Sequence, residues 1–190
     1  MKAVAAAAPP AATPQIWPLG VKAYHALGDL GLIPVKTELL YGQIFHKVSK
    51  SPFHVYLLRV LLNLLQAAAP KGFFVSSEQP ITCPDSEPEP DLAVVRGEVA
   101  DYRHAHPTTA ELVIEICVST HEYDRSKLRA YASAGVKECW LVLGPEKQIE
   151  VHRQPLGEAF SECELHGLGG SLTSAAVPEF TVSLDKLFGT

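Results

Sequence analysis

The chain has 190 residues, of which 47% are hydrophobic and 19% charged, so it can bury the core of one domain. Its formal net charge of −5 argues against the broad basic surface of a strong non-specific nucleic-acid binder, although a local basic groove remains compatible with it. The four cysteines stand far apart without a CxxC pair, which disfavours a zinc ribbon and fits a reduced, cytoplasmic protein.

The N-terminal part predicts a tail, a helix and a hairpin. Residues 1–14 are rich in Ala and Pro and predict a disordered tail, and Pro9 and Pro10 interrupt the apolar run that a signal peptide needs. A single domain is therefore expected over residues 15–190. Residues 21–30 predict a short helix, and residues 37–48 predict a hairpin that turns at Tyr41 and Gly42.

A long apolar segment follows. Pro52 fits the first turn of a helix, and the apolar positions of residues 55–69 cover most of that helix's circumference. This pattern predicts a helix sandwiched in the core. Arg59, Asn63 and Gln66 interrupt the run, which is too short and too polar to cross a bilayer, so no membrane partner is expected.

The rest of the chain predicts strands with one crossover helix. Strands are expected at 73–82, 91–95, 111–118, 136–143 and 148–154, a helix at 125–135, and strand pieces with a short helix at the end. A helix between the strands at 111–118 and 136–143 usually makes them parallel neighbours. The fold class is therefore α/β (α+β), with a mixed sheet.

One strand carries a carboxylate in an apolar setting. The period of two along ELVIEICV places Leu112, Ile114, Ile116 and Val118 on one face and Val113, Glu115 and Cys117 on the other. A carboxylate among such neighbours is costly unless it is paired or binds a metal. A plain ion pair with a Lys or Arg, or an exposed strand, remains an alternative interpretation of Glu115.

Two further residues favour a site. Asp91 follows a proline at the start of a strand, and Lys127 follows the Glu115 strand closely. Two carboxylates at a sheet edge suit a hard divalent cation such as Mg²⁺, and a nearby ammonium suits a phosphate or developing negative charge. These are the parts needed for metal-assisted phosphodiester hydrolysis.

The order of these motifs resembles a known family. The Pro-Asp pair, ELVIEI and STHEYDRSKLRAYASAGVKECWLV resemble the PD-(D/E)XK nuclease superfamily and, more closely, its Uma-type family of putative restriction endonucleases. The resemblance covers about residues 35–155 and includes TELLYGQIF and SPFH. It implies a restriction-endonuclease-like mixed central β-sheet flanked by helices, with an active site at one edge.

The resemblance also implies roles for individual residues. Asp91 and Glu115 match the two acids and would hold the metal together with the backbone carbonyl of Ile116. Cys117 stands where most of the superfamily has its Lys, and Lys127 matches the Lys that the Uma-type pattern moves into the following helix. Glu38 is the nearest match to an acid near the first hairpin. Two further residues, His54 and Arg125, are candidates for contact with the substrate.

The function implied is a Mg²⁺-dependent (or Mn²⁺-dependent) endonuclease that hydrolyses phosphodiester bonds in DNA. Homodimers are implied as well, because superfamily members that cut both strands often act as dimers. Two alternatives stay open. One is a catalytically inactive nuclease-like module that binds nucleic acid or regulates. The other is a structural protein in which Glu115 and Lys127 form a buried ion pair.

Overall fold

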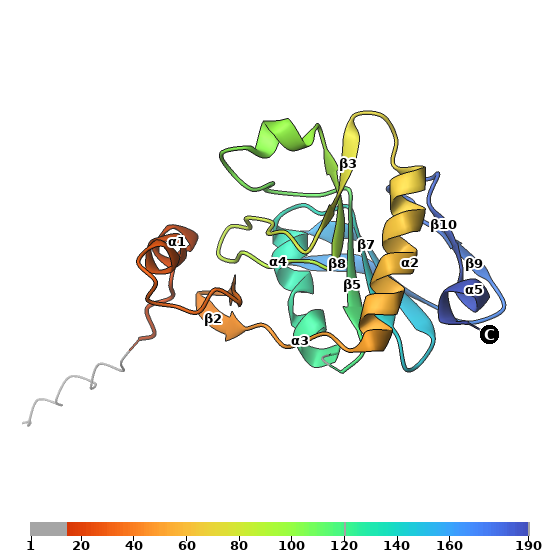
Figure 1. Cartoon of the computed structure of the whole chain (residues 1–190), viewed down its shortest axis with the longest axis horizontal. Coiled ribbons are helices and arrows are strands. Elements are labelled where there is room, and N and C mark those ends of the chain that lie inside the picture. Colours follow the sequence, from red (N-terminus) through yellow and green to blue (C-terminus); the bar gives the residue numbers. More distant parts are fainter. Residues whose placement is uncertain (1–14, 120, 190) are drawn as a thin grey trace, which may run out of the picture.

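A six-stranded sheet forms the centre of the protein. The computed structural model describes residues 15–119 and 121–189, so the predicted tail at residues 1–14 lies outside the described residues. In the described part, the sheet order is β3-β4-β5-β6-β7-β8 (Figure 1). These strands are β3 (Phe73–Ser77), β4 (Leu92–Arg96), β5 (Leu112–Cys117), β6 (Glu138–Leu143), β7 (Gln148–Leu156) and β8 (Ala159–His166).

The sheet is mixed, as the crossover pattern predicts. Strands β5 and β6 are parallel, with Glu115 beside Leu141, and every other neighbouring pair in this sheet is antiparallel. The first paired residue of β4 is Leu92, which lies opposite Ile114. Strand β5 therefore continues past the beginning of β4, and the last residues of β5 do not pair with β4. This step positions the site described below.

The alternation along β5 separates two cores. Leu112, Ile114 and Ile116 pack in a cluster with residues of α2 (Pro52–Ala68), α5 (Leu184–Phe188) and the hairpin of β9 (Ser171–Thr173) and β10 (Thr181–Ser183). Val113 and Cys117 pack in a second cluster with α4 (Leu128–Ser133), which follows α3 (His121–Ser126). The predicted two faces of this strand are thus confirmed, and helices cover both sides of the sheet (Figure 1).

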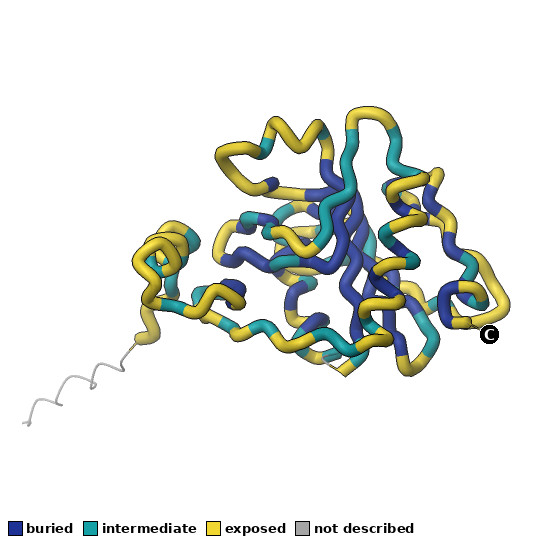
Figure 2. Tube along the Cα trace, viewed as in Figure 1, coloured by how far each residue is buried: buried dark blue, intermediate teal, exposed yellow. Residues whose placement is uncertain are grey.

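The N-terminal part extends away from the sheet. Helix α1 (Val21–Asp29) has no buried residue, and it leads into the hairpin of β1 (Thr37–Leu40) and β2 (Gln43–His46). The turn needs Gly42, because its φ is 74° and a Cβ there would lie 2.4 Å from the Cβ of Pro18. By contrast, β1 is buried throughout and its Leu39 pairs with Glu87 (Figure 2). The hairpin therefore brings buried side chains up to the main body.

Two helix predictions were wrong. Helix α2 is not sandwiched in the core: Leu57 and Leu61 are buried against the sheet, while Val55 and Leu64 are 41% and 39% exposed, because the sheet lies on only one side of the helix. The crossover helix begins earlier than predicted, at His121, and is divided at Lys127 into α3 and α4. The acids of the expected loop lie in the first turn of α3, where the helix dipole favours them.

Candidate active site

The residues predicted to be catalytic line one cavity. Its volume is about 310 Å³, and Glu38, Asp91, Glu115 and Lys127 all contribute to its wall. They come from β1, the start of β4, β5 and the junction of α3 with α4. Segments far apart in the sequence thus meet where β5 passes the beginning of β4.

Asp91 is held against the next strand. Its Oδ2 accepts a hydrogen bond from the backbone N–H of Ile116 at 2.7 Å and lies 3.1 Å from Nε2 of His54, while its Oδ1 accepts from Lys50. Nδ1 of His54 is buried and has no partner among the described residues, which fits the tautomer with the proton on Nε2. The N–H and C=O of a strand residue face the same edge, so the Ile116 carbonyl faces this edge too.

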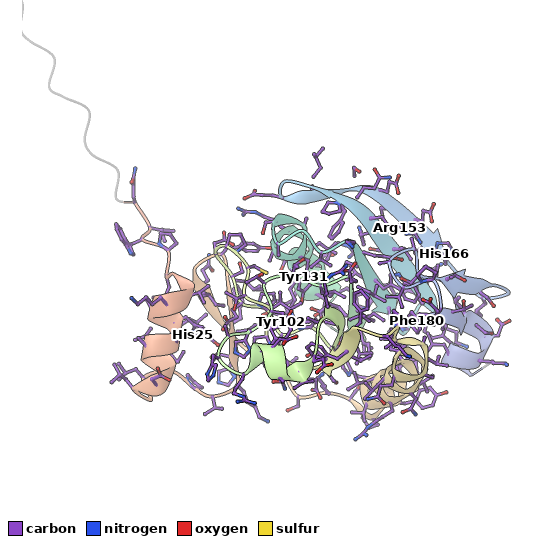
Figure 3. The ribbon with its side chains drawn as sticks, turned by 90° about the horizontal axis from the view of Figure 1, so that it is seen from above. His25, Tyr102, Tyr131, Arg153, His166 and Phe180 are labelled. Atoms are coloured by element: carbon purple, nitrogen blue, oxygen red, sulfur yellow. The ribbon has the colours of Figure 1, made fainter. Side chains whose placement is uncertain are left out.

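Glu115 meets Lys127 in the protein interior. Oε1 of Glu115 lies 3.3 Å from Nζ of Lys127 and accepts a hydrogen bond from Tyr131 at 2.5 Å. The same ammonium lies 3.2 Å from Oε1 of Glu38, which also accepts a hydrogen bond from Tyr123 at 2.8 Å. Tyr131 is fully buried and lies well inside the molecule (Figure 3). Two phenols and one ammonium thus fix two buried carboxylates.

Burial and charge shift the titration of this cluster. Burial raises the pKa of the Glu115 carboxyl to about 8; Lys127 opposes the rise, and the acids around it, Asp91 first, add to it. Burial alone would lower the pKa of Lys127, but the charges of Glu115 and Glu38 raise it, so the side chain is cationic. Burial and Glu115 together raise the pKa of Tyr131, so its phenol remains a hydrogen-bond donor.

Asp91 titrates in the opposite direction. Burial alone would raise the pKa of its carboxyl, but the hydrogen bond with His54 and the charge of Lys50 lower it below its ordinary value. Asp91 is therefore ionised at neutral pH, whereas Glu115 becomes fully ionised only above neutrality. Such a separation between two neighbouring carboxyls is characteristic of functional sites, although structural ion-pair networks also produce it.

The comparisons with known proteins identify the family and the fold. Residues 27–185 match the Uma2 family, described as "Putative restriction endonuclease". The chain belongs to this family. Its fold is similar to that of a solved protein from Anabaena variabilis, described as "a putative nuclease belonging to DUF820", with a TM-score of 0.72 and 18% identity over 86% of this chain and 97% of that one. No curated protein matches the sequence.

The composition of the cavity wall in this family member fits a divalent cation. Six carboxylates line it, those of Glu38, Glu78, Glu89, Asp91, Glu115 and Asp124, against the three ammonium groups of Lys47, Lys50 and Lys127. Of these groups, Glu38, Asp91, Glu115, Asp124 and Lys127 are buried, and such a surplus of buried acids over buried cations is unfavourable without a further cation. Carboxylate and backbone carbonyl oxygens are the ligands that Mg²⁺ and Mn²⁺ prefer. Asp91, Glu115 and the carbonyl of Ile116 therefore form a suitable set of ligands.

The other predicted residues divide into two groups. His54 lines the cavity and contacts Asp91, so it lies at the site. Arg125 is not among the described residues that line the cavity; it pairs with Glu150 of β7 and lies 3.7 Å from Glu122. A substrate contact by Arg125 would therefore need a substrate that extends beyond the cavity.

Sequence reasoning missed three residues that shape this site. Lys50, Tyr123 and Tyr131 each bond directly to one of its carboxylates. The ring of Tyr131 is buried, and its hydroxyl binds Glu115. A usable signal existed for this residue, because a buried tyrosine hydroxyl usually needs a polar partner and Glu115 was the nearest predicted candidate.

Proposed function

We propose that this protein is a Mg²⁺- or Mn²⁺-dependent endonuclease that hydrolyses phosphodiester bonds in DNA. The observation that carries the proposal is the convergence of Asp91, Glu115, Glu38 and Lys127 on one cavity, with acids in excess. Membership of the Uma2 family supports the same chemistry. The proposed ligands are Asp91, Glu115 and the Ile116 carbonyl, which would hold the cation.

The chain's own groups support a hydrolytic role. Lys50 and His54 fix the carboxylate of Asp91, so the first ligand is oriented before any cation binds. Tyr131 and Tyr123 do the same for Glu115 and Glu38. Lys127 is a buried ammonium at the cavity, where it would stabilise the charge that develops on a scissile phosphate. A divalent cation bound there would supply Lewis-acid catalysis and lower the pKa of a bound water.

The cavity also contains groups suited to a polyanion. Residues 46–51 and His54 line the cavity, and this segment carries His46, Lys47, Lys50 and His54. This local basic segment supports a DNA substrate despite the net charge of −5. The alternative, a nuclease-like module without turnover, would use the same cations to bind nucleic acid. Cleavage distinguishes the two.

We also propose a cytoplasmic homodimer. Ile16, Trp17 and Val35 of the N-terminal part are 89%, 93% and 100% exposed, which supports a surface that a second copy covers. None of the helices in residues 15–119 and 121–189 is long and apolar enough to cross a membrane. Light scattering after size-exclusion chromatography would test the dimer, with Trp17→Ser as the variant expected to weaken it.

The deciding experiment is cleavage by purified protein. Supercoiled, linear duplex and single-stranded DNA would be incubated with Mg²⁺, Mn²⁺ or EDTA, using wild type, Asp91→Asn, Glu115→Gln and the control Glu111→Gln. The control removes a buried carboxylate that pairs with Arg96 and Lys137 outside the cavity lining. Metal-dependent cutting that is lost only in the two site variants supports the proposal. Binding without cutting by wild type would favour the inactive module.

A further inference from the structure

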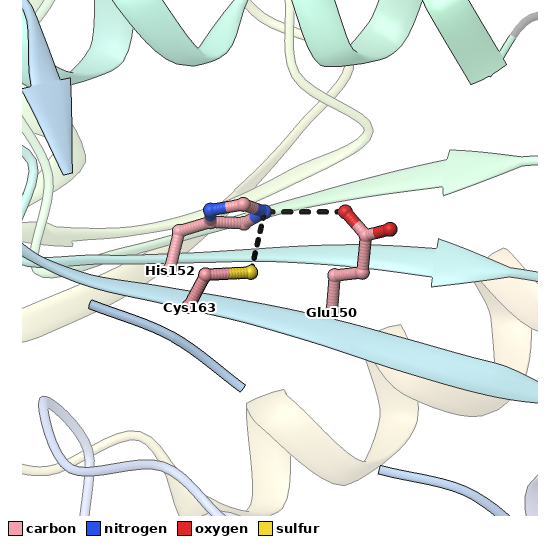
Figure 4. A group of neighbouring side chains, drawn as sticks. All are labelled: Glu150, His152 and Cys163. Atoms are coloured by element: carbon pink, nitrogen blue, oxygen red, sulfur yellow. Dashed lines mark hydrogen bonds and ion pairs between the residues drawn. The ribbon is translucent and has the colours of Figure 1, made fainter. Parts of the chain in front are cut away.

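A second group of ligand-type side chains lies outside the cavity. Glu150 and His152 are on β7 and Cys163 is on β8. The register pairs His152 directly with Cys163, and the period of two along β7 puts Glu150 on the same face. One ligand atom from each residue lies within 4.8 Å of the other two (Figure 4).

The contacts converge on a single nitrogen. Nε2 of His152 lies 3.3 Å from Oε2 of Glu150 and 3.9 Å from Sγ of Cys163. Both dashed lines in Figure 4 meet at that nitrogen. A Cys–His–acid relay for nucleophilic catalysis needs the acid on one ring nitrogen and the thiol on the other. Here the acid and the thiol approach the same ring nitrogen, so the relay is not formed. Ligand atoms that lie close together in this way are, however, what a shared cation requires.

The spacing fits tetrahedral coordination. Bond lengths of about 2.0–2.1 Å to nitrogen and oxygen and about 2.3 Å to sulfur give tetrahedral N···O and N···S edges of about 3.4 and 3.6 Å. The structure has 3.3 and 3.9 Å for these edges. Small side-chain rotations would therefore suffice to close the site around an ion.

We propose that Glu150, His152 and Cys163 bind a zinc ion, with the fourth position open to water. Carboxylate, imidazole and thiolate are all zinc ligands, whereas Mg²⁺ prefers oxygen alone. The exposed Cys163 gives zinc a route from solvent.

One contact opposes the ion. Arg125 of α3 forms an ion pair with Oε1 of Glu150, and its positive charge lowers the affinity for any cation. It leaves Oε2, the oxygen near His152, as the ligand atom. The ion would thus lie beside the helix that also carries Tyr123 of the cavity. The proposal is independent of nuclease activity, because it uses residues that do not line the cavity.

Binding of zinc and cobalt to the full chain tests the proposal. Zn²⁺ alone would be titrated calorimetrically into wild type, Cys163→Ser, His152→Ala and Glu150→Gln, and Co²⁺ would report a thiolate ligand through its charge-transfer absorption. Each substitution is expected to weaken zinc binding at least about tenfold, the scale set by outer-shell losses. The cobalt–thiolate band is expected in wild type and absent in Cys163→Ser.

Two controls make the result decisive. Asp91→Asn perturbs the cavity and is expected to retain both zinc affinity and the cobalt band. Glu162→Gln removes an exposed carboxylate from the adjacent position of β8 and is expected to bind like wild type. The proposal is overturned if wild type binds no zinc, if Cys163→Ser binds it equally well, or if Asp91→Asn abolishes it. Circular dichroism and Tm verify folding, and Glu150→Gln serves as the second variant if Cys163→Ser is unstable.

Discussion

The carboxylate of Asp91 accepts a hydrogen bond from the backbone N–H of Ile116. The residue immediately before β4 is therefore bound to the part of β5 that does not pair with β4. This single bond places Asp91 beside Glu115, the neighbour of Ile116, at the point where β4 no longer covers β5. The proposed ligands therefore come from one small piece of sheet. Its geometry follows from strand register, while helices α2, α3 and α4 and the loop before α2 supply the groups that orient it.

Loss of the Lys127 ammonium should destabilise the metal-free protein. Lys127→Met keeps the apolar length of the side chain but leaves Glu115 and Glu38 buried without their shared cation. Breaking a buried pair in this way typically costs about 3–5 kcal/mol. Urea denaturation at about pH 9, above the pKa of about 8 for Glu115, should show a loss of about that size in the free energy of unfolding, and a smaller loss at pH 5, where Glu115 is protonated.

The control for this change is Lys137→Met. Lys137 pairs with Glu111, but its side chain is 58% exposed, so the loss should be no more than about 1 kcal/mol. Mg²⁺ or Mn²⁺ should partly restore the stability of Lys127→Met, since it replaces the missing positive charge at the same acids. Equal stability of Lys127→Met and wild type would contradict the idea of an ionised buried cluster.

Metal affinity should rise with pH. Burial raises the pKa of Glu115 to about 8, so a proton occupies this ligand at lower pH and must leave before a cation binds. Affinity should therefore increase between about pH 6 and 8, by up to about tenfold per unit for one released proton, and level off above that range. Asp91 should not change the metal affinity between pH 6 and 8, because its pKa is lowered and it is already ionised in this range.

Mn²⁺ titration at several pH values checks this expectation. Glu115→Gln has no such proton, so its weaker affinity should be flat over the same range. A wild-type affinity that does not change between pH 6 and 8 would show that Glu115 is already ionised at the lower pH, contrary to the burial argument.

The sequence was most informative where chemistry and periodicity coincide. The period of two along β5 predicted which face carries Glu115, the neighbouring pattern selected Asp91 and Lys127, and the resemblance added Glu38. The structure brings all four to one cavity. Neither could predict Lys50, because its contact with Asp91 spans 41 positions and depends on the path of an irregular loop. The sequence did not predict where α3 begins and ends, because its mostly polar residues show no helical repeat of apolar positions.

Removal of the Tyr131 hydroxyl should weaken the site more than the fold. Tyr131→Phe preserves the buried ring and deletes the hydrogen bond to Oε1 of Glu115, which still has Lys127. Stability should fall by about 1.5–3 kcal/mol, the scale of one hydrogen bond to a charged group. Metal affinity or cleavage should fall about 10–100-fold, as for other groups that orient metal ligands.

Tyr102→Phe is the matched control. Its hydroxyl donates to the carbonyl of Arg96 in an exposed setting, so neither stability nor activity should change appreciably. Chemical denaturation and Mn²⁺ titration of both variants provide the comparison. If Tyr131→Phe lost stability but kept full metal affinity and cleavage, Tyr131 would be a structural residue only.

Glu138 shows what distinguishes a structural buried carboxylate from a functional one. It is 1% exposed on β6, yet its oxygens accept hydrogen bonds from Trp140 at 2.7 Å, Ser174 at 2.9 Å and the backbone N–H of Ala176 at 2.8 Å. The donors of Ser174 and Ala176 join the C-terminal segment to the sheet, and Trp140 lies on the same strand as Glu138. Both are acids next to apolar strand residues, but Glu138 is the first residue of β6, whereas Glu115 stands in the middle of β5.

Glu138→Ala should therefore destabilise the fold without regard to metal. It leaves several buried donors without an acceptor, each at about 1–3 kcal/mol, and should lower the free energy of unfolding by at least about 3 kcal/mol. Glu164→Ala removes an exposed partner of Arg153 and should leave stability nearly unchanged. Denaturation with and without Mn²⁺ should show that the metal raises the free energy of unfolding of Glu138→Ala by the same amount as that of wild type. If Mn²⁺ no longer stabilised Glu138→Ala, Glu138 would support the metal site, and the distinction between a structural Glu138 and a functional Glu115 would fail.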